Sequence, residues 1–436
     1  MDRLLNPDKV SGLGNREKEM LRKLLKVYNS TKAHNEEKER YYEGKISLSE
    51  VNLGIALPKG IEGLEIGCAW GAKTVDVLAS RSMFDGFVGA NGEEIEDLAQ
   101  IVNDNNLIAE YPKASRDELK IGCSFATLSA DDAIKCRIRF HSANTAAAVW
   151  DGEKGRIGYG MAIVDTAPDN TGKIWRPSEI NLYTDDAIWV LTRTGERWSA
   201  EELPHKMGRP LMEPLIYNPT STKPFGQSRI SVDCMNLQDK ARYTITRMEV
   251  LAEFNSFPQK YILGTSADSD LDTVKATYTS FLEITKDDDG DKPTMGQFQQ
   301  ATMQPLIDQL NSYAKLFAGI TGLTTDDLGF VTDNPSSAEA IKAGHGDLER
   351  IATKAQDTLG SGFLNVGLVA ACLRDQYHYS RKAIYETTPI WKPIYQMDIS
   401  AISSFGDAVI KINEAAPNSI TPRTMQRLTG LPFEGV

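Results

Sequence analysis

"DNPSSAEAIKAGHGDLERIATKAQ", residues 333 to 356, holds the change from loop to helix that decides the fold of this chain. Ser336 is followed three residues later by Glu339, which is the spacing of a capping box. Pro335 restricts the residue before it to extended geometry and blocks an earlier start. The spacing therefore predicts a helix that begins at Ser336 or Ser337.

The predicted helix keeps one apolar face over a long distance and carries several glycines. In a helix interior each glycine costs about 1 kcal/mol relative to alanine, so these positions indicate a bend or a closely packed neighbour. We expect His345 to lie inside this helix as a packing or surface residue, so "GHGD" is not a phosphate-binding corner. The face comprises Ile341, Leu348, Ala352, Ala355, Leu359, Phe363, Val366, Ala370 and Leu373, and the glycines are Gly344, Gly346, Gly360, Gly362 and Gly367.

The length and composition are those of an ordinary globular protein. It has 436 residues, 41% hydrophobic and 25% charged, which is enough for two to three domains and a sizeable core. The net charge of −12 argues against a protein that grips nucleic acid by neutralising phosphates. It is compatible with a protein past which nucleic acid must slide.

Cysteine usage and the termini indicate a cytoplasmic chain. The N-terminus, "MDRLLNPDKVSG", has no apolar signal-peptide core, and "FLNVGLVAACL" (363–373) is too short to span a bilayer. The cysteines are scattered, odd in number and form no C-x-x-C pair, as expected of free thiols in a reducing compartment. They are Cys68, Cys123, Cys136, Cys234 and Cys372.

Along the chain, the spacing of apolar and turn residues predicts helices first, then strands, then helices again. Residues 15–43 predict a charged amphipathic helix, and Lys73–Phe87 a helix that runs into a turn at Asp85–Gly86. From about 120 to 216, short β-like runs broken by Asp-Gly, Thr-Gly and Pro predict mostly antiparallel sheet. Helices return at 230–256 and 303–322, around a β-like "QKYILG", and the tail reads as loop and short helices.

"GCAWGAKT" (67–74) resembles a nucleotide-binding P-loop. A true P-loop has glycine directly before the lysine, but here that position is Ala72, and no clear strand leads into it. We therefore interpret the stretch as the start of a helix.

Acidic and histidine residues give no metal site. "DSDLD" (268–272) begins like a calcium loop but has Thr273 and Thr279 where glycine and glutamate are required. The five histidines lie far apart without ligand companions. "DDDGD" (287–291) reads as a solvated hairpin tip or as an acidic docking knob. No catalytic residue, metal or cofactor is predicted.

Several segments, in order along the chain, resemble the portal proteins of tailed bacteriophages, in the branch of long-tailed phages of Gram-positive hosts. They are "VDVLASRSMFDGF" (75–87), "PFGQSRIS" (224–231), "EFNSFPQKYILG" (253–264), "LFAGITGLTTDDLG" (316–329) and "NPSSAEAIKAGHGDLE" (334–349).

The resemblance implies an α+β portal-type fold in named regions. An α/β wing would occupy 1–229, and a two-helix stem 230–256 and 303–321 around a small α/β clip at 257–302. A tunnel loop at 322–337 would lead into a long bent wing helix at 338–375, followed by a helical crown at 376–436.

The resemblance also implies the surroundings of the chain. Subunits would form a ring of about twelve at one capsid vertex of the virion, after synthesis in the host cytoplasm. Double-stranded DNA would pass through the ring without sequence specificity. Terminase, head-completion or adaptor proteins, and major capsid and scaffold proteins would be partners, and no membrane is implied.

Two groups of residues are candidate sites under this resemblance. Partner docking at the clip would use Asp287, Asp288, Asp289 and Asp291. We expect the tunnel loop to be anchored against neighbouring subunits by Leu323, Leu328 and Phe330. The DNA channel would be lined by Leu323, Thr324, Thr325, Asp326, Asp327, Phe330, Asp333 and Asn334.

Two alternatives remain open at this point. The first is a nucleotide-dependent enzyme that uses the degenerate "GCAWGAKT". The second is another virion structural or scaffold protein of mixed α/β type.

Overall fold

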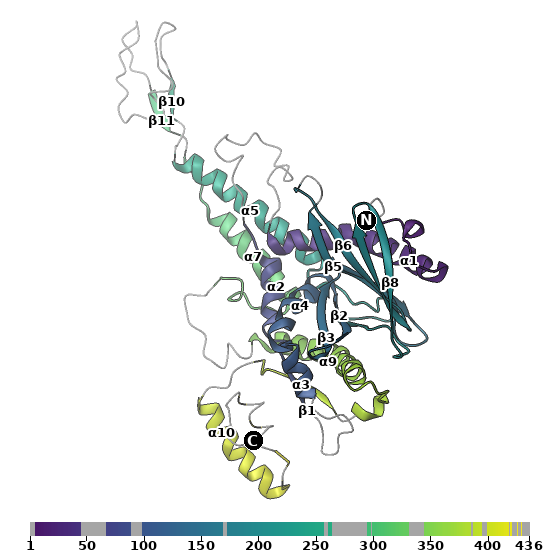
Figure 1. The fold of residues 1–436 in the computed structure, drawn as a ribbon. Coiled ribbons are helices and arrows are strands. Elements are labelled where there is room, and N and C mark those ends of the chain that lie inside the picture. The colour runs from purple at the N-terminus through teal and green to yellow at the C-terminus, as the bar shows by residue number, and fades with distance from the viewer. Residues whose placement is uncertain are drawn as a thin grey trace.

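A computed structural model describes most of the chain and gives an α+β protein. The described residues are 5–44, 67–88, 98–168, 172–256, 260–263, 294–297, 299–330, 344–384, 387–394, 399–417, 419, 420, 425 and 429. In them, every pairing between named strands is antiparallel. Figure 1 shows a body of sheets and helices from which two helices project.

The larger sheet of the described residues is a meander in the order β4-β5-β6-β7-β8. Its core lies against helix α1 (Asn15–Glu43), which follows the short helix η1 (Pro7–Lys9) and buries Leu21, Leu24 and Leu25. Apolar spacing along 15–43 predicted this face, and the structure confirms it. The strands are β4 (Ala146–Asp151), β5 (Arg156–Pro168), β6 (Trp175–Tyr183), β7 (Ala187–Thr194) and β8 (Arg197–Pro204).

A three-stranded sheet in the order β3-β2-β9 forms the second layer. Its strands are β2 (Cys123–Asp131), β3 (Lys135–Ser142) and β9 (Met212–Ile216). The antiparallel strand region predicted for 120–216 is therefore confirmed, although it divides between two sheets. This sheet packs against α9 (Gly346–Asp375) and α4 (Leu107–Ile121), and α4 in turn contacts α2 (Trp70–Ala79) and α3 (Leu98–Asp104).

Two glycines of α9 allow close packing against neighbouring elements. A Cβ atom on Gly362 would lie 2.8 Å from the Pro214 carbonyl oxygen, and one on Gly367 would lie 3.2 Å from the Phe87 ring. The expectation that helix glycines mark close neighbours is confirmed at these positions. Between the two glycines, Phe363 stacks on Phe84 with ring centroids 4.1 Å apart.

The predicted turn at Asp85–Gly86 is wrong. Both residues lie in β1 (Phe84–Val88), which pairs with β12 (Thr388–Trp391) from the far end of the chain. The register shifts between Phe84 and Gly86, where Gly86 has a φ of +119°. Asp-Gly here forms a strand irregularity because long-range pairing overrides its local preference for a turn.

Helices α5 (Val232–Ser256) and α7 (Gln304–Thr321) project from the body side by side, as Figure 1 shows. At their far end β10 (Lys260–Leu263) pairs with β11 (Thr294–Gln297). The predictions of helix over 230–256 and 303–322 and of a β-like "QKYILG" are confirmed, with bounds shifted by one or two residues.

The place of His345 differs from the prediction. His345 is the N-cap of α9, so it lies at the helix boundary and not inside the helix. Glycines on both sides of His345 make the backbone there freer to leave helical geometry. The start predicted at Ser336 or Ser337 lies outside the described residues.

The C-terminal region contains more regular structure than the tail pattern predicted. It includes the short helix η3 (Arg381–Ile384), strand β12 and the 17-residue helix α10 (Ile399–Ala415). Within the described part of the chain, no helix combines the length and apolar character needed to cross a membrane. All five cysteines are buried free thiols.

Candidate functional site

The segment that leaves α7 is shaped by a glycine. Gly322 caps α7 with a φ of +69°, a backbone geometry that other residues adopt at a cost. A Cβ atom there would also lie 2.7 Å from Ile351 of α9. The next residue, Leu323, is buried in the core. The chain therefore turns back against the body immediately after α7.

Residues 324–330 form a compact turn held by reciprocal bonds. The Thr324 amide and hydroxyl both donate to Oδ2 of Asp327 at 2.9 Å, and the Asp327 amide donates to the Thr324 hydroxyl at 3.2 Å. The Phe330 amide donates to the Thr325 carbonyl at 3.0 Å. The carboxylate of Asp327 thus stabilises the turn by accepting bonds from groups that would otherwise need water.

The same carboxylate joins the turn to the start of α9. Nε2 of His345 lies 3.4 Å from Oδ2 of Asp327, with side-chain exposures of 15% and 20%. The carbonyl of His345 accepts the first helical bond, from Glu349 at 3.0 Å. "GHGD" is accordingly a helix start that contacts the loop.

The two adjacent acidic residues of the loop differ in their surroundings. Asp326 is exposed, whereas the carboxylate of Asp327 is engaged within the turn. Thr324 and Thr325 are half-buried. Asp333 and Asn334 lie outside the described residues.

The apolar residues of the loop pack on their own subunit. Leu323 belongs to the core, and Leu328 and Phe330 pack against it. The Phe330 ring lies 6.2 Å from the ring of Trp70 in α2. The expectation that these three side chains anchor the loop against neighbouring subunits is therefore wrong for Leu323, and Leu328 and Phe330 have core contacts of their own.

Arg229 is a structural residue that the sequence interpretation did not single out. Its guanidinium donates to the Thr321 carbonyl at 2.5 Å, to the Thr74 carbonyl at 3.0 Å and to the Tyr217 hydroxyl at 3.2 Å. Carbonyls in the last turn of a helix lack partners within the helix. Arg229 therefore connects the end of α7 to α2 and to the segment after β9.

The "GCAWGAKT" segment lies mostly in α2 and is not a phosphate loop. The Gly71 amide donates to Oε1 of Gln238 in α5 at 2.8 Å, and a Cβ atom at Gly71 would lie 2.9 Å from the Tyr41 carbonyl oxygen. A P-loop needs free backbone amides around the phosphate. The interpretation of this stretch as a helix start is confirmed, and its Lys73 is exposed.

A buried carboxyl group, Glu118, also went unpredicted. It is 1% exposed and accepts bonds from the Tyr111 hydroxyl at 2.8 Å and from the Ser124 hydroxyl at 3.4 Å. Burial raises the pKa of the Glu118 carboxyl to about 8, since the charged form is poorly solvated there. Apolar spacing carries no signal for such a residue.

The predicted clip acids, Asp287, Asp288, Asp289 and Asp291, lie outside the described residues. The strands described at this end are β10 and β11. In the described residues, no group of three or more histidine, cysteine or acidic side chains could hold a metal ion.

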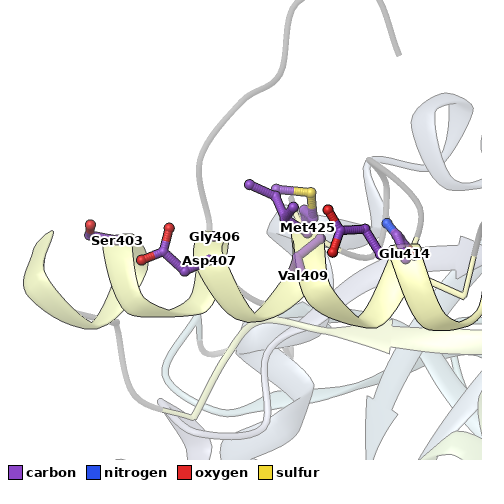
Figure 2. Close-up of a pocket in the computed structure, with 8 residues that line it drawn as sticks. Ser403, Gly406, Asp407, Val409, Glu414 and Met425 are labelled. Atoms are coloured by element: carbon purple, nitrogen blue, oxygen red, sulfur yellow. The ribbon is translucent and has the colours of Figure 1, made fainter.

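Helix α10 carries an open groove of about 620 Å³. Val409, Ile410 and Met425 give it apolar walls, and Asp407 and Glu414 lie along it, as Figure 2 shows for the labelled residues. Ile410 is 60% exposed. The groove has the character of a contact surface more than of a reaction site.

The chain is similar in sequence to known phage portal proteins. The family model described as "Phage portal protein, SPP1 Gp6-like" matches residues 21–402. Relatives named "Portal protein" from Mycobacterium phage D29 and Mycobacterium phage L5 are each 25% identical over 307 residues, 67% of this chain. The chain spans 62% of the length of those relatives.

Two solved structures are similar in outline. One, described as "Neck of empty GTA particle computed with C6 symmetry", has a TM-score of 0.46 and 11% identity over 86% of this chain and 94% of the other. The other, "Neck of native GTA particle computed with C12 symmetry", has a TM-score of 0.46 and 12% identity over 89% and 99%. The family match over residues 21–402 confirms the resemblance drawn from the sequence: the chain belongs to the SPP1 Gp6-like family of phage portal proteins.

Proposed function

We propose that this chain is a portal subunit, which forms a ring at one capsid vertex and provides the channel for DNA packaging and ejection. The observation that carries the proposal is the family match over residues 21–402. The projecting pair α5–α7, followed by a turn held against the start of α9, agrees with it. About twelve copies would make the ring, with the virion as its final location and the host cytoplasm as the place of assembly.

The regions of the portal follow from this proposal. The wing is 1–229 with the long helix of 338–375, the stem is 230–256 and 303–321, and the clip is 257–302. The tunnel loop is 322–337 and the crown is 376–436. Two hydrogen bonds support the division, since they fix the base of the stem to the wing: Arg229 donates to the Thr321 carbonyl, and the Gly71 amide donates to Gln238.

Within the ring, the loop after α7 would face double-stranded DNA without reading its sequence. The residues proposed for this surface are Thr324, Thr325, Asp326, Asp327, Phe330, Asp333 and Asn334, with Leu323 as their buried support. The whole segment 322–337 contains no lysine or arginine. Carboxylates repel phosphates, so DNA would slide without the counterion-release grip of a DNA-binding protein.

The clip would be the docking platform for terminase and for head-completion or adaptor proteins. The four aspartates of "DDDGD" are the proposed contact because a cluster of one sign favours a basic partner. Major capsid and scaffold proteins would contact the wing and crown. Such an acidic contact should weaken as salt screens charges beyond a Debye length of about 8 Å.

The chain would have no catalytic activity, and packaging energy would come from a separate ATPase. The alternative, a nucleotide-binding enzyme that uses "GCAWGAKT", is disfavoured because the Gly71 amide is already bonded to Gln238. The other alternative, a different virion structural protein, is disfavoured by the extent of the family match.

Electron microscopy of the purified protein and of assembled particles tests the ring directly. We expect rings with a central hole, or a ring at one vertex if the isolated protein stays monomeric. Compact particles without a hole, together with the absence of a vertex ring in assembled heads, would refute the proposal.

A single substitution tests the channel surface. Asp326→Lys should allow ring assembly and slow packaging, most strongly at low salt, because a cation now faces the phosphates. Glu153→Lys, an exposed site in the β4–β5 turn, is the control and should package normally. Asp326 is the better choice over Asp327, whose carboxylate holds the turn. Normal packaging by Asp326→Lys would remove this residue from the channel.

A further inference from the structure

A cleft of about 550 Å³ lies between α1, β4 and the segment before α5. Its lining is mainly apolar and includes the alanines of β4, Phe125, Phe225 and Ile230. At its rim Val232, the first residue of α5, is 62% exposed. An apolar cleft with an exposed apolar rim is typical of a surface that a partner covers.

The charged side chains that line this cleft are cationic. Lys38 and Lys223 contribute to the lining beside His34, whose pKa is lowered by burial, and none of the lining residues is an aspartate or glutamate. This is unexpected for a chain with 60 acidic and 48 basic residues. Glu37 lies 3.9 Å from His34 on α1 but does not line the cleft.

Lys38 is the more buried of the two lysines, at 2% exposure. Its ammonium donates to the Ile230 carbonyl at 2.8 Å and lies 3.4 Å from the Met235 sulfur. Among the described residues no carboxylate forms an ion pair with it, and burial lowers the pKa of Lys38. Its ammonium, with neutral partners, adds to the positive potential of the cleft.

The five-stranded sheet has β4 at the edge beside the cleft and β8 at its opposite edge, and β8 carries acidic and apolar side chains. The first half of β8 is covered by Ser11, whose amide donates to the Trp198 carbonyl at 3.1 Å and whose carbonyl accepts from the Ala200 amide at 2.8 Å. Beyond this cover Glu201, Glu202 and Leu203 are exposed. Leu203 is 47% exposed and shares a face of the strand with Glu201, whereas Glu202 lies on the opposite face.

The strand order places these two surfaces on different sides of one subunit. The cleft borders β4 and the acidic segment ends β8, which are the two edges of the five-stranded sheet. Four strand spacings separate them by about 19 Å. Figure 1 shows β8 on the side of the sheet away from α5.

We propose that Glu201–Leu203 of one copy docks in the Lys38 cleft of the next copy. The leucine would lie against the apolar wall and the Glu201 carboxylate near the exposed Lys223, with the buried ammonium of Lys38 adding to the positive potential. Because donor and acceptor are different surfaces, the contact is head-to-tail and propagates from subunit to subunit, as a ring requires. This inference rests on the proposed ring and assigns one of its contacts.

Charge reversal on each side tests the contact. Glu201→Lys with Glu202→Lys should raise the protein concentration for half-maximal ring formation about tenfold or more, because like charges would face each other. His34→Glu with Lys223→Glu should do the same, and combining the four changes should restore assembly. Glu153→Lys is the matched control and should assemble like wild type. Assembly is measured by native mass spectrometry and by counting rings in micrographs.

A cross-link identifies the neighbours independently. Rings assembled from equal parts of ordinary and ¹⁵N-labelled protein are treated with a carbodiimide, which joins amines to carboxylates at contact distance. We expect mixed-isotope peptides that join Lys223 to Glu201 or Glu202. If both charge-reversed variants form rings like wild type and no such peptide is found, this inference is overturned and the proposed function remains intact. A wild-type chain that forms no ring, alone or in particles, contradicts both.

Discussion

Replacing Glu118 with glutamine should stabilise the protein at neutral and alkaline pH. Burial raises the pKa of this carboxyl from its ordinary value of 4.5 to about 8. The folded state therefore holds the proton more tightly than the unfolded state. The contribution of Glu118 to stability is greatest below pH 4.5, falls as the pH rises towards 8, and is constant above that.

The magnitude follows from the two pKa values. The full difference corresponds to about 5 kcal/mol of unfolding free energy, of which about 3 kcal/mol is already lost at pH 7. Glutamine never ionises, and its amide oxygen can still accept from the Tyr111 hydroxyl. Allowing about 1 kcal/mol for an imperfect bond to the new amide group, Glu118→Gln should be roughly 2 kcal/mol more stable than wild type at pH 7.

Urea unfolding followed by circular dichroism measures this difference at pH 5, 6, 7 and 8. We expect the advantage of Glu118→Gln over wild type to be small or negative at pH 5 and to grow steadily to pH 8. Glu153→Gln, which removes an exposed carboxylate, should follow wild type within about 0.5 kcal/mol at each pH. A difference that does not change with pH, or a variant less stable at pH 8, would refute the assignment of a neutral buried carboxyl.

Four further substitutions test the packing and the hydrogen bond at the end of α7. Phe363→Ala should cost about 3–5 kcal/mol and lower the Tm, because it empties a site among stacked aromatic rings. Gly362→Ala should cost about 1–3 kcal/mol, since the new methyl meets the β9 backbone, while Gly406→Ala on α10, where the space is open, should be neutral or slightly stabilising in the same melts. Arg229→Met should raise amide hydrogen exchange in the last turn of α7, because the Thr321 carbonyl loses its partner; unchanged exchange there would show that the bond does not hold the helix end.

Local patterns were sufficient to predict the elements that depend on local sequence. Helix α1 followed from Leu21, Leu24 and Leu25 at helical spacing, and the strands followed from alternation between turn residues. The pair β1–β12 did not follow, because its hydrogen bonds join segments about three hundred residues apart. Helices α3 and α4 also went unpredicted, and α4 includes an internal proline, Pro112, that opposes a helical interpretation.

The candidate loop was located from the sequence, but the roles of its residues were not. The prediction treated Asp326 and Asp327 alike, whereas the structure exposes the first and bonds the second to Thr324 and His345. The spacing Thr-x-x-Asp could have indicated a capped turn. No local signal connects Asp327 to His345, since that contact depends on where the start of α9 lies relative to the turn after α7.

The state of the cysteines makes this chain suitable for site-directed labelling. All five thiols are buried, and burial raises the pKa of Cys68 to about 11 and of Cys123 and Cys136 to about 12. Thiol reagents attack the thiolate, so native positions should react slowly with maleimides. A cysteine introduced at exposed Asp326 would then carry one fluorophore or spin label per subunit without removal of the natural residues. If the proposed ring forms, the distances between identical labels would report the diameter of its opening with and without DNA.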